Sequence, residues 1–351
     1  MRRLARAVLA APLILLLTAG PLLACGGLIG PNGAVNLLRT TTFAGYHDGV
    51  EHYVTAFEFA GGGGRFGSIL PLPGIPTKVE RGGDWTLQRL GIETSPIVAF
   101  SAQPASAGGE ADKAEVILKT RIDALDITVL RGGGSAVGAW ASQQGFRLPA
   151  DAPEVLDFYA ARSPIFLAAS FDADAAAALG QSLGDGTPVH LTIPTDNPWV
   201  PLRILGLGKT GTETVAADVY LMTDDRPALL PLPALAGLRV EYDKAASDLL
   251  VADLRSDKGM EWVPERAWLT KIGIDVEARS LTYDLAVDAS GMGRPSVIDA
   301  GFVMPDIESD RSPSPAGDLA RWFGGLGFIG LGIGFVAWLV RVRTGLPGTP
   351  A

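Results

Sequence analysis

Three histidines are the residues of this chain best suited to proton transfer or metal binding, since imidazole does both near neutral pH. His47 and His52 flank an Asp48-Gly49 pair, which is typical of a two-residue hairpin turn. On such a hairpin the two rings would share one face diagonally and offer two metal ligands. Zinc sites use three or four protein ligands, and no third is evident. We therefore predict no metal and no cofactor, with His47 and His52 the first residues to test should a metal be found.

A third histidine and a glycine-rich segment are the next candidates for chemistry. His190 alternates with Leu191, so we expect its ring to point outward from a strand. The segment Gly132-Gly133-Gly134-Ser135 lies between an expected strand and an expected helix, the setting of a nucleophile elbow or a phosphate loop. Val137 stands where the elbow needs glycine, and no Gly-Lys-Ser or Gly-Lys-Thr follows. We predict no catalytic residue here, only a flexible connection in which Ser135 caps the helix.

Residues 195–203 form a rigid segment, because two prolines bracket Trp199 and fix the backbone there. An extended backbone could present Trp199, together with Asp196 and Arg203, as a recognition site. Trp199 could equally fill the core between two sheets, and we favour the core because large aromatic side chains are usually mostly buried. The three residues remain the candidate recognition site.

The elements that must position these residues are mainly short strands. Residues 40–59 are expected to form a hairpin, and residues 68–74 a strand that ends or lies at a sheet edge, because proline cannot donate to a ladder. Further strands are expected at residues 115–118, 126–130, 165–170, 190–193, 202–205 and 216–222. Short helices are expected from Asp84 to Leu90, around Trp140, and behind Asp151. The mixed order favours an α+β fold with a mainly antiparallel sheet over a doubly wound one.

The proline-rich residues 226–233 are a plausible boundary within this fold. They divide it into a first β-rich part, residues 25–225, and a second part, residues 234–305, with a strand at 238–242 and a long alternating run at 268–287. Small polar residues at 101–112 predict a surface loop. Ser-Pro repeats at 306–321 predict an extended stalk.

The N-terminus has the composition of an export signal. Residues 1–24 carry three arginines and then an apolar run, which ends at Cys25, the expected processing site. Leu22 is unsuited to ordinary signal peptidase, and Leu22 and Ala24 before Cys25 resemble the bacterial lipobox, although Leu23 is bulkier than usual there. Cys25 is therefore either lipidated or the start of a plainly cleaved chain.

The C-terminal segment predicts a membrane anchor. Residues 322–340 carry no charge over 19 positions and precede Arg341 and Arg343, so a single transmembrane helix is expected with residues 341–351 in the cytoplasm. The domain before it would face the outside of the cell membrane. Gly330 and Gly334 have the spacing that lets two membrane helices approach, so a homodimer through this face is an option.

Charge and cysteine content limit the partners. The chain carries a net charge of −9, and its two terminal segments contribute five arginines and no acid, which leaves −14 on residues 25–340. A surface this acidic repels phosphate backbones, so binding to nucleic acid is excluded. Cys25 is the single cysteine, so no intrachain disulfide can form.

A series of motifs runs in order from residue 25 to about residue 285. It comprises Cys25-Gly26-Gly27-Leu28, the prolines and apolar residues of 70–76, residues 126–130 with Trp140 and 145–149, and residues 190–196 leading into 199–203. These motifs resemble the bacterial domain-of-unknown-function family 2330, exported proteins whose mature part opens Cys-Gly-Gly and to which no activity is assigned. Relatives often carry a second cysteine soon after Cys-Gly-Gly, where Ile29 and Gly30 stand here. Its absence excludes an N-terminal disulfide and favours the lipidated form of Cys25.

These observations favour a membrane-anchored cell-envelope protein whose outer domain binds or scaffolds another envelope protein without catalysis. Few histidines and three incomplete motifs weigh against an enzyme. The alternative is an exported hydrolase whose site the sequence does not reveal. A deep pocket joining Asp196, Arg203 and a hydroxyl group would favour that alternative.

Overall fold

The computed structural model describes residues 27–30, 33–34, 40–57, 66–94, 116–180, 187–290 and 292–302. They belong to one compact unit, Met1–Met304. Residues 1–24, Cys25, the expected loop at 101–112, the stalk and residues 322–351 lie outside the described residues. No helix in the described ranges combines the length and apolar character that a membrane crossing requires.

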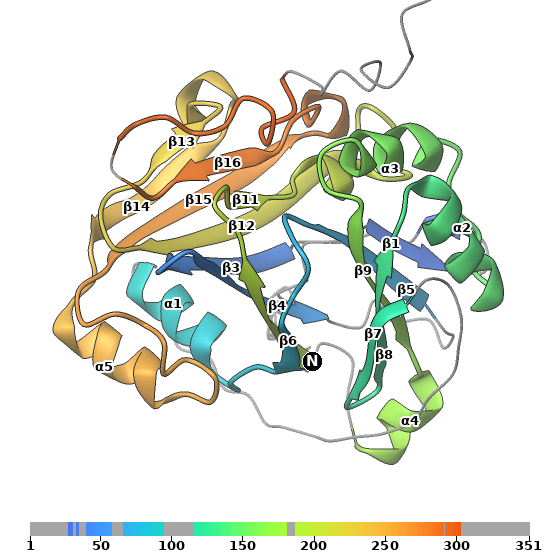
Figure 1. Ribbon diagram of the computed structural model, residues 1–351, viewed down its shortest axis with the longest axis horizontal. Helices are drawn as coiled ribbons and strands as arrows, with labels where there is room; N and C mark the ends of the chain where they lie inside the picture. The colour runs from blue at the N-terminus through green and yellow to red at the C-terminus, as the bar shows by residue number, and fades with distance from the viewer. Residues whose placement is uncertain are drawn as a thin grey trace, which may run out of the picture. The chain divides into compact units, whose positions relative to one another are not determined.

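The elements are short and mostly strands (Figure 1). The strands are β1 Gly27–Gly30, β2 Gly33–Ala34, β3 Thr40–His47, β4 Val50–Phe57, β5 Phe66–Leu72, β6 Lys78–Arg81, β7 Val116–Ile122, β8 Leu125–Arg131, β9 Ile165–Phe171, β10 Thr187–Pro194, β11 Trp199–Val200, β12 Thr214–Thr223, β13 Ala228–Leu230, β14 Arg239–Ala245, β15 Trp268–Glu277 and β16 Leu285–Asp288. The helices are α1 Thr86–Thr94, α2 Gly134–Gln143, α3 Ala152–Ala160, α4 Ala173–Ala178 and α5 Asp248–Ser256, with 3₁₀ turns η1 Arg203–Gly206, η2 Pro233–Leu235 and η3 Ala278–Ser280.

The described strands form three sheets. A six-stranded sheet has the order β2-β1-β5-β9-β8-β7, a seven-stranded sheet the order β14-β15-β12-β3-β4-β10-β6, and a small sheet the order β11-β16-β13. Pairing is antiparallel throughout these sheets except between β12 and β3, which are parallel. The predicted α+β class with mainly antiparallel sheets and few helices is confirmed.

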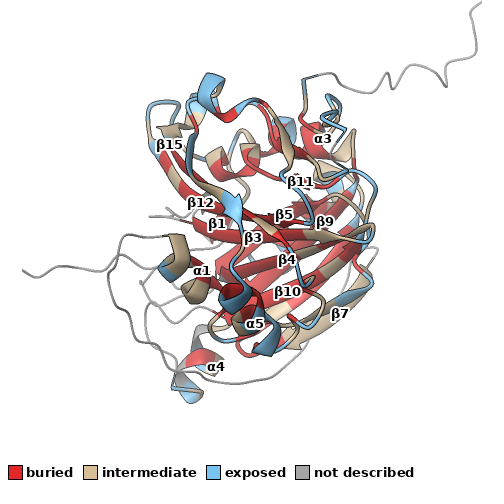
Figure 2. Cartoon of the chain, turned by 90° about the vertical axis from the view of Figure 1, so that its left-hand side faces the viewer, coloured by how far each residue is buried: buried red, intermediate tan, exposed pale blue. Residues whose placement is uncertain are grey.

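The two large sheets pack face to face, and helices cover their outer faces. One apolar cluster joins Tyr53 and Leu191 of the seven-stranded sheet to Leu70 and Leu167 of the six-stranded sheet. Figure 2 shows these strands as the most buried part of the fold. Side chains of α2 and α3, including Trp140, pack on the six-stranded sheet.

A second apolar cluster lies on the opposite face of the seven-stranded sheet. It joins Phe43 and Val54 of that sheet to Leu90 of α1 and Leu254 of α5. The inner strands of the seven-stranded sheet are therefore covered on both faces, and both alternating sets of their side chains are largely buried.

The first hairpin follows the prediction. Asp48 and Gly49 have φ values of 48° and 76°, as the two central positions of a type I′ turn require. The register that follows from this turn pairs His47 with Val50 and Gly45 with His52. The turn chemistry thus fixes which face of the sheet each histidine reaches.

The strand at residues 68–74 was expected to end early or lie at an edge, and it does end at Leu72. It is an inner strand between β1 and β9. Only Gly67, Ser68 and Ile69 pair with β1, so Pro71 lies beyond that ladder. Its missing N–H is therefore not needed on that side.

Two expected elements are wrong, the strand at 202–205 and the continuous run at 268–287. Residues 202–205 form η1 rather than a strand, because the N–H groups of Leu202 and Arg203 donate to Asp284 Oδ1 and are unavailable to a ladder. The run at 268–287 is not continuous, since β15 ends at Glu277 and β16 belongs to the small sheet. The proline-rich residues 226–233 include β13 of that sheet.

Of the predicted helix caps, Asp151 is confirmed in position only, and Ser135 and Asp84 are wrong. Ser135 lies inside α2, whose N-cap is Gly133. Asp151 is at the N-cap of α3, but its carboxylate accepts from the Gly208 N–H at 2.9 Å instead. Asp84 forms an ion pair with Arg81, while the distant Asp257 caps α1.

The two predicted parts, residues 25–225 and 234–305, share the seven-stranded sheet. β12 precedes the expected boundary and β15 follows it, and the two strands pair over their whole length from Thr214↔Glu277 to Thr223↔Trp268. The division at residues 226–233 stays a prediction.

Candidate functional site

An apolar groove opens between the small sheet and the outer end of the seven-stranded sheet. It has a volume of about 570 Å³, within the 300–1,000 Å³ usual for ligand pockets. Its lining includes Leu229 and Leu230 of β13, Leu232, Pro233, Val240 of β14 and Pro295. We call it the β13–β14 groove.

Exposed apolar side chains gather in the two segments that border this groove. Seven of the ten large apolar side chains exposed in the described residues belong to residues 232–240 and 292–302. Leu235 is 84% exposed and Met292 71%. Scattered exposed apolar residues need no explanation, whereas a concentration of them in adjoining segments marks an interaction surface.

The described chain ends beside the groove. Phe302 stacks on Tyr283 with ring centroids 6.0 Å apart, and the Tyr283 hydroxyl donates to the Ala236 carbonyl at 3.0 Å. Ala236 follows η2 directly, and Pro233 of η2 lines the groove. Phe302, the last residue that the structure describes, therefore lies at the border of the apolar surface.

A charged pair marks the rim of the groove. Arg226 forms an ion pair with Asp243, which also accepts from Trp268 Nε1 at 2.6 Å and Thr270 Oγ1 at 3.2 Å. Burial alone would raise the pKa of Asp243, but the hydrogen bonds from Arg226 and Trp268 outweigh it and lower the pKa. Asp243 therefore stays ionised and ties β14 to the segment before β13.

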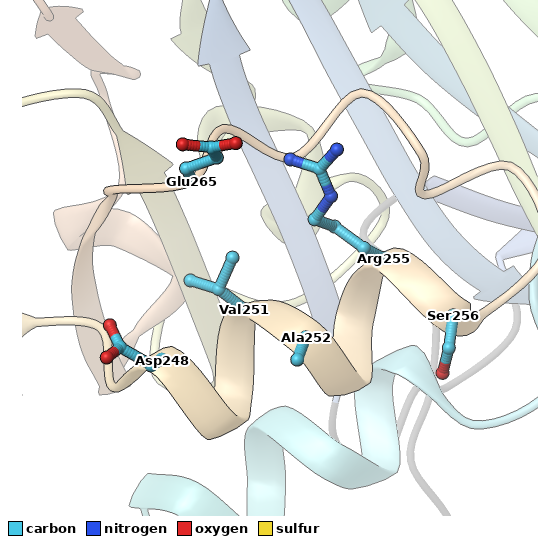
Figure 3. A pocket seen from close by; sticks show the side chains of 6 residues that line it. All are labelled: Asp248, Val251, Ala252, Arg255, Ser256 and Glu265. Carbon is cyan, nitrogen blue, oxygen red and sulfur yellow. The ribbon is translucent and has the colours of Figure 1, made fainter.

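A second hollow lies along α5 (Figure 3), with a volume of about 490 Å³. Asp248, Val251, Ala252, Arg255 and Ser256 of the helix line it, together with Glu265. Arg255 crosses to the facing loop and donates from Nη1 to the Val263 carbonyl at 3.0 Å. Neither hollow is lined by Asp196, Trp199 or Arg203.

The candidate recognition residues occupy different environments. Trp199 is 1% exposed and stacks on Tyr159 with centroids 5.8 Å apart. Arg203 bonds Glu154 and lies over the Phe158 ring, 4.3 Å from its centroid. Asp196 is exposed at the turn before β11. The structure thus brings Trp199 and Arg203 against α3 and leaves Asp196 at the surface.

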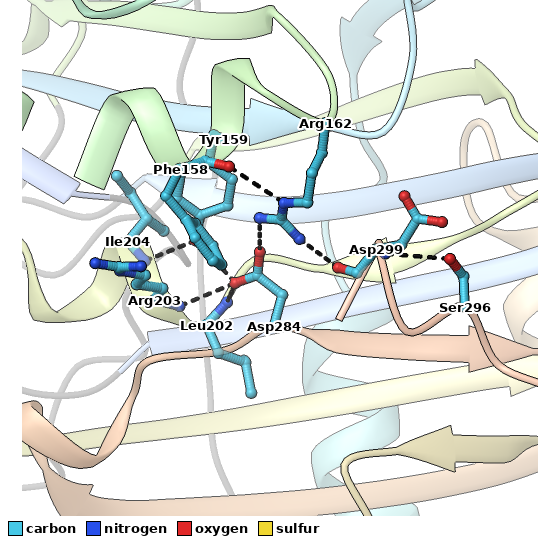
Figure 4. A network of polar contacts seen from close by, with 9 residues as sticks. All are labelled: Phe158, Tyr159, Arg162, Leu202, Arg203, Ile204, Asp284, Ser296 and Asp299. Carbon is cyan, nitrogen blue, oxygen red and sulfur yellow. Dashed lines mark hydrogen bonds and ion pairs between the residues drawn. The ribbon is translucent and has the colours of Figure 1, made fainter. Parts of the chain in front are cut away.

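Trp199 and Arg203 border a buried polar network that the sequence does not reveal (Figure 4). Arg162 Nη2 and Asp284 Oδ2 are 2.6 Å apart, and both side chains are 0% exposed. The Tyr159 hydroxyl donates to Asp284 Oδ1 at 2.8 Å and accepts from the Ile204 N–H. Through these buried contacts the network holds α3, η1 and β16 together.

Burial decides the protonation of this network. It raises the pKa of Asp284, against the opposing effect of Arg162, and it raises the pKa of Tyr159 well above its usual value. Tyr159 therefore stays a hydroxyl donor at all physiological pH values. The ion pair to Arg162 and three further donors hold the Asp284 carboxylate in place.

The histidines pair differently from the expectation. His47 Nδ1 lies 2.7 Å from Asp224 Oδ1, whereas His52 Nδ1 lies 3.0 Å from His190 Nε2. The prediction that His190 points outward is wrong, because its side chain is 3% exposed under residues that cover this face of the sheet. Among the described residues, no group of three or more His, Cys, Asp or Glu side chains is arranged to hold a metal ion.

Burial lowers the pKa of both paired histidines. The pKa of His190 falls to about 4, and that of His52 falls to about 3 through burial and the neighbouring His190 and His47. Both rings are neutral at neutral pH, and one donates its N–H to the other.

Three solved structures resemble the fold weakly. The crystal structure of baculovirus P35 has a TM-score of 0.33 and 11% identity, covering 71% of this chain and 91% of that one. A mutated baculovirus P35 after caspase cleavage gives 0.34 and 8%, covering 71% and 93%. The caspase-8/P35 complex gives 0.32 and 9%, covering 71% and 90%.

Family membership is clearer than structural similarity. No curated protein matches the chain. A family model does match, from residue 22 to residue 288, and this span contains every motif quoted for the resemblance. The chain therefore belongs to the bacterial family described as "Uncharacterized protein conserved in bacteria (DUF2330)".

Proposed function

We propose that this protein is a membrane-anchored envelope protein that binds an extended, apolar segment of an uncharged or basic envelope protein in the β13–β14 groove. The anchor would be residues 322–340, with the domain outside the cell membrane. The observation that carries the proposal is the apolar groove, bordered by the densest group of exposed apolar side chains in the described part of the chain.

The strands at the groove support an extended ligand. β13 and β14 are each terminal in their described sheets, so each has one edge without a strand partner there. Such an edge presents free N–H and C=O groups that pair with an added strand. Alternate side chains of that strand would enter the apolar lining, while its backbone supplies the hydrogen bonds.

Charge supports a protein partner over the bilayer surface. Residues 25–340 carry a net charge of −14, and the cytoplasmic and many outer leaflets are anionic, so the domain is repelled rather than attracted. A neutral or basic polypeptide has no such penalty. The proposal therefore commits to a polypeptide, and lipid contact is an outcome that the test can return.

The surroundings of Asp196 and Arg203 favour a binding function over a hydrolase. The hydrolase alternative calls for a pocket shared by Asp196, Arg203 and a hydroxyl group. Asp196 is exposed at a turn, and Arg203 is engaged by Glu154 and Phe158. Their side chains have separate surroundings, which supports the non-catalytic function.

The test is site-specific photo-crosslinking of the full chain in its own cells. A photoreactive amino acid would replace Leu232 or Val240 at the groove, and Leu249 would serve as the matched control, because it is 67% exposed but lies on α5. We expect the two groove positions to give the same polypeptide adduct and Leu249 to give none. A synthetic peptide of the adduct segment should bind the full chain, and Val240→Glu should abolish that binding.

Two results would overturn the proposal. Adducts to phospholipid at Leu232 and Val240 would mean that this surface contacts the bilayer. Equal adducts at the groove and at Leu249, or a peptide that binds equally well to the Val240→Glu chain, would mean that the groove is not the binding surface.

A further inference from the structure

The buried His190 and the half-buried His52 lie beneath residues 257–263, a segment that we call the strap. We propose that His52 and His190 form an acid-sensitive latch: when both rings are protonated they separate, and the strap lifts off the seven-stranded sheet. This latch stands independently of the groove and of the proposed binding function.

The contact between the two rings allows only a limited number of protons. His52 Nδ1 and His190 Nε2 are 3.0 Å apart, so one nitrogen must donate and the other accept. A single added proton can be shared along this line. Two imidazolium rings would place two N–H groups and two positive charges against each other in a largely buried site, which Coulomb repulsion makes unfavourable.

The strap covers both rings. The Trp262 indole stacks on His52 with centroids 3.9 Å apart and an interplanar angle of 5°. A Cβ on Gly259 would lie 3.1 Å from His190 Nδ1, so the strap backbone also passes over the second ring. Neither ring can move toward solvent on this side without displacing the strap.

A glycine on β3 makes room for the strap. A Cβ on Gly45 would lie 2.0 Å from Trp262 Cη2, so the indole occupies space that other residues would fill. The Trp262 indole nitrogen is buried and has no hydrogen-bond partner in the described part of the chain. The indole is therefore held by stacking and packing alone. Loss of its stacking on His52 would remove one of its main contacts.

The carboxylates next to the pair stabilise a proton on His190, whereas the charges that act on His52 are those of the neighbouring histidines. Glu80 Oε1 lies 3.6 Å from His190 Nδ1 and 2.6 Å from Lys78 Nζ. Glu80 and Glu261 of the strap favour the charged form of His190, and Lys78 opposes it. His47 opposes protonation of His52. An imidazolium at His52 would be attracted to the Trp262 face, which delays release until the second ring is also charged.

The strap is tied to the helices on this face. Asp257 Oδ2 accepts from the Thr86 N–H at 2.9 Å and the Thr86 hydroxyl at 2.7 Å, which caps α1. Val263 accepts from Arg255 across the α5 hollow. Lifting the strap would therefore reshape that hollow and loosen the start of α1, so external acid would change the surface of the domain without unfolding its other half.

Hydrogen exchange measured by mass spectrometry on the full chain in detergent micelles tests the latch. Exchange would be compared at pH 7.0 and pH 2.5, below the pKa of both rings, with times corrected for intrinsic rates. We expect strap peptides to exchange at least ~10-fold faster at pH 2.5, because a locally opened segment loses its protection. Peptides from α2 and α3 should stay protected.

Neutral substitutions provide the controls. His52→Gln and His190→Gln remove one titrating ring each and should abolish the acid response of the strap, whereas His47→Gln should retain it. Since His52 is only half-buried, its variant gives a reading even if the His190 variant fails to fold. An acid response that persists in His52→Gln, its absence in the unmodified chain, or simultaneous loss of protection in α2 and α3 would each overturn the latch.

Discussion

Replacing Glu51 by glutamine should change how the stability of the domain depends on pH. Glu51 lies on β4 and is 1% exposed, and neither carboxyl oxygen has a hydrogen bond in the described part of the chain. Burial raises the pKa of this carboxyl to about 8, although the nearby Trp199 backbone N–H lowers it somewhat. The side chain is therefore protonated in the folded protein at neutral pH.

The sign of the effect follows from proton uptake. Unfolded Glu51 ionises above a pKa of 4.5 and folded Glu51 above about 8, so folding takes up a proton between these values. Each pH unit in that window lowers the free energy of unfolding by about 1.4 kcal/mol. Between pH 5 and pH 8 the loss amounts to about 3–4 kcal/mol, a large part of the 5–15 kcal/mol typical of a domain.

Urea unfolding of residues 26–310 and of its Glu51→Gln variant at pH 5 and pH 8 measures this loss. The difference between the two proteins isolates Glu51, because the histidines contribute equally to both. Glu51→Gln should gain about 3–4 kcal/mol relative to the unmodified domain on going from pH 5 to pH 8, or roughly 1 M in urea midpoint. The exposed Glu265→Gln is the matched control. Parallel pH profiles for the unmodified domain and Glu51→Gln would show that the folded protein carries an ionised Glu51.

The remaining predictions concern the buried ion pair, the strap and the anchor. Asp284→Ala leaves Arg162 buried and unpaired, so it should destabilise the domain by about 3–5 kcal/mol in chemical unfolding; a loss below about 1 kcal/mol would mean that water reaches the guanidinium. Gly45→Ala should displace Trp262, cost about 1–3 kcal/mol and shift Trp262 fluorescence, and an unchanged spectrum would contradict the packing described. Protease added to intact, wall-stripped cells should leave only a small C-terminal fragment that includes residues 322–351, whereas a fully protected domain would refute the proposed topology.

Local chemistry predicted the elements whose form depends on neighbouring residues. The Asp48-Gly49 pair determined its turn and hence the hairpin register, and the mixed order of strands and helices indicated the correct fold class. The strand predicted at 202–205 is wrong because its structure depends on a residue distant in the sequence. The backbone N–H of Leu202 donates to Asp284, about eighty residues later. The residues next to Leu202 in the sequence give no sign of that distant partner.

His190 shows why alternation along a strand was misleading. An alternating pattern implies one wet face only if one face of the sheet is open to water. The seven-stranded sheet is covered on one face by the six-stranded sheet and on the other by α1, α5 and the strap. The groove was likewise beyond prediction, because residues 226–233 look like a boundary until residues 292–302 are brought beside them.

The parallel pairing of β3 with β12 has a consequence for the order of folding. Thr40 pairs with Ala217 and Tyr46 with Thr223. During synthesis, β3 therefore lacks its partner strand until more than 170 further residues have been made. Until then the first hairpin has an open edge and apolar side chains such as Phe43 exposed to solvent. Such non-local pairing slows folding and exposes the chain to aggregation. A growing chain that stops before β12 has no native partner for this edge, so the edge and the apolar side chains of the hairpin stay open to aggregation.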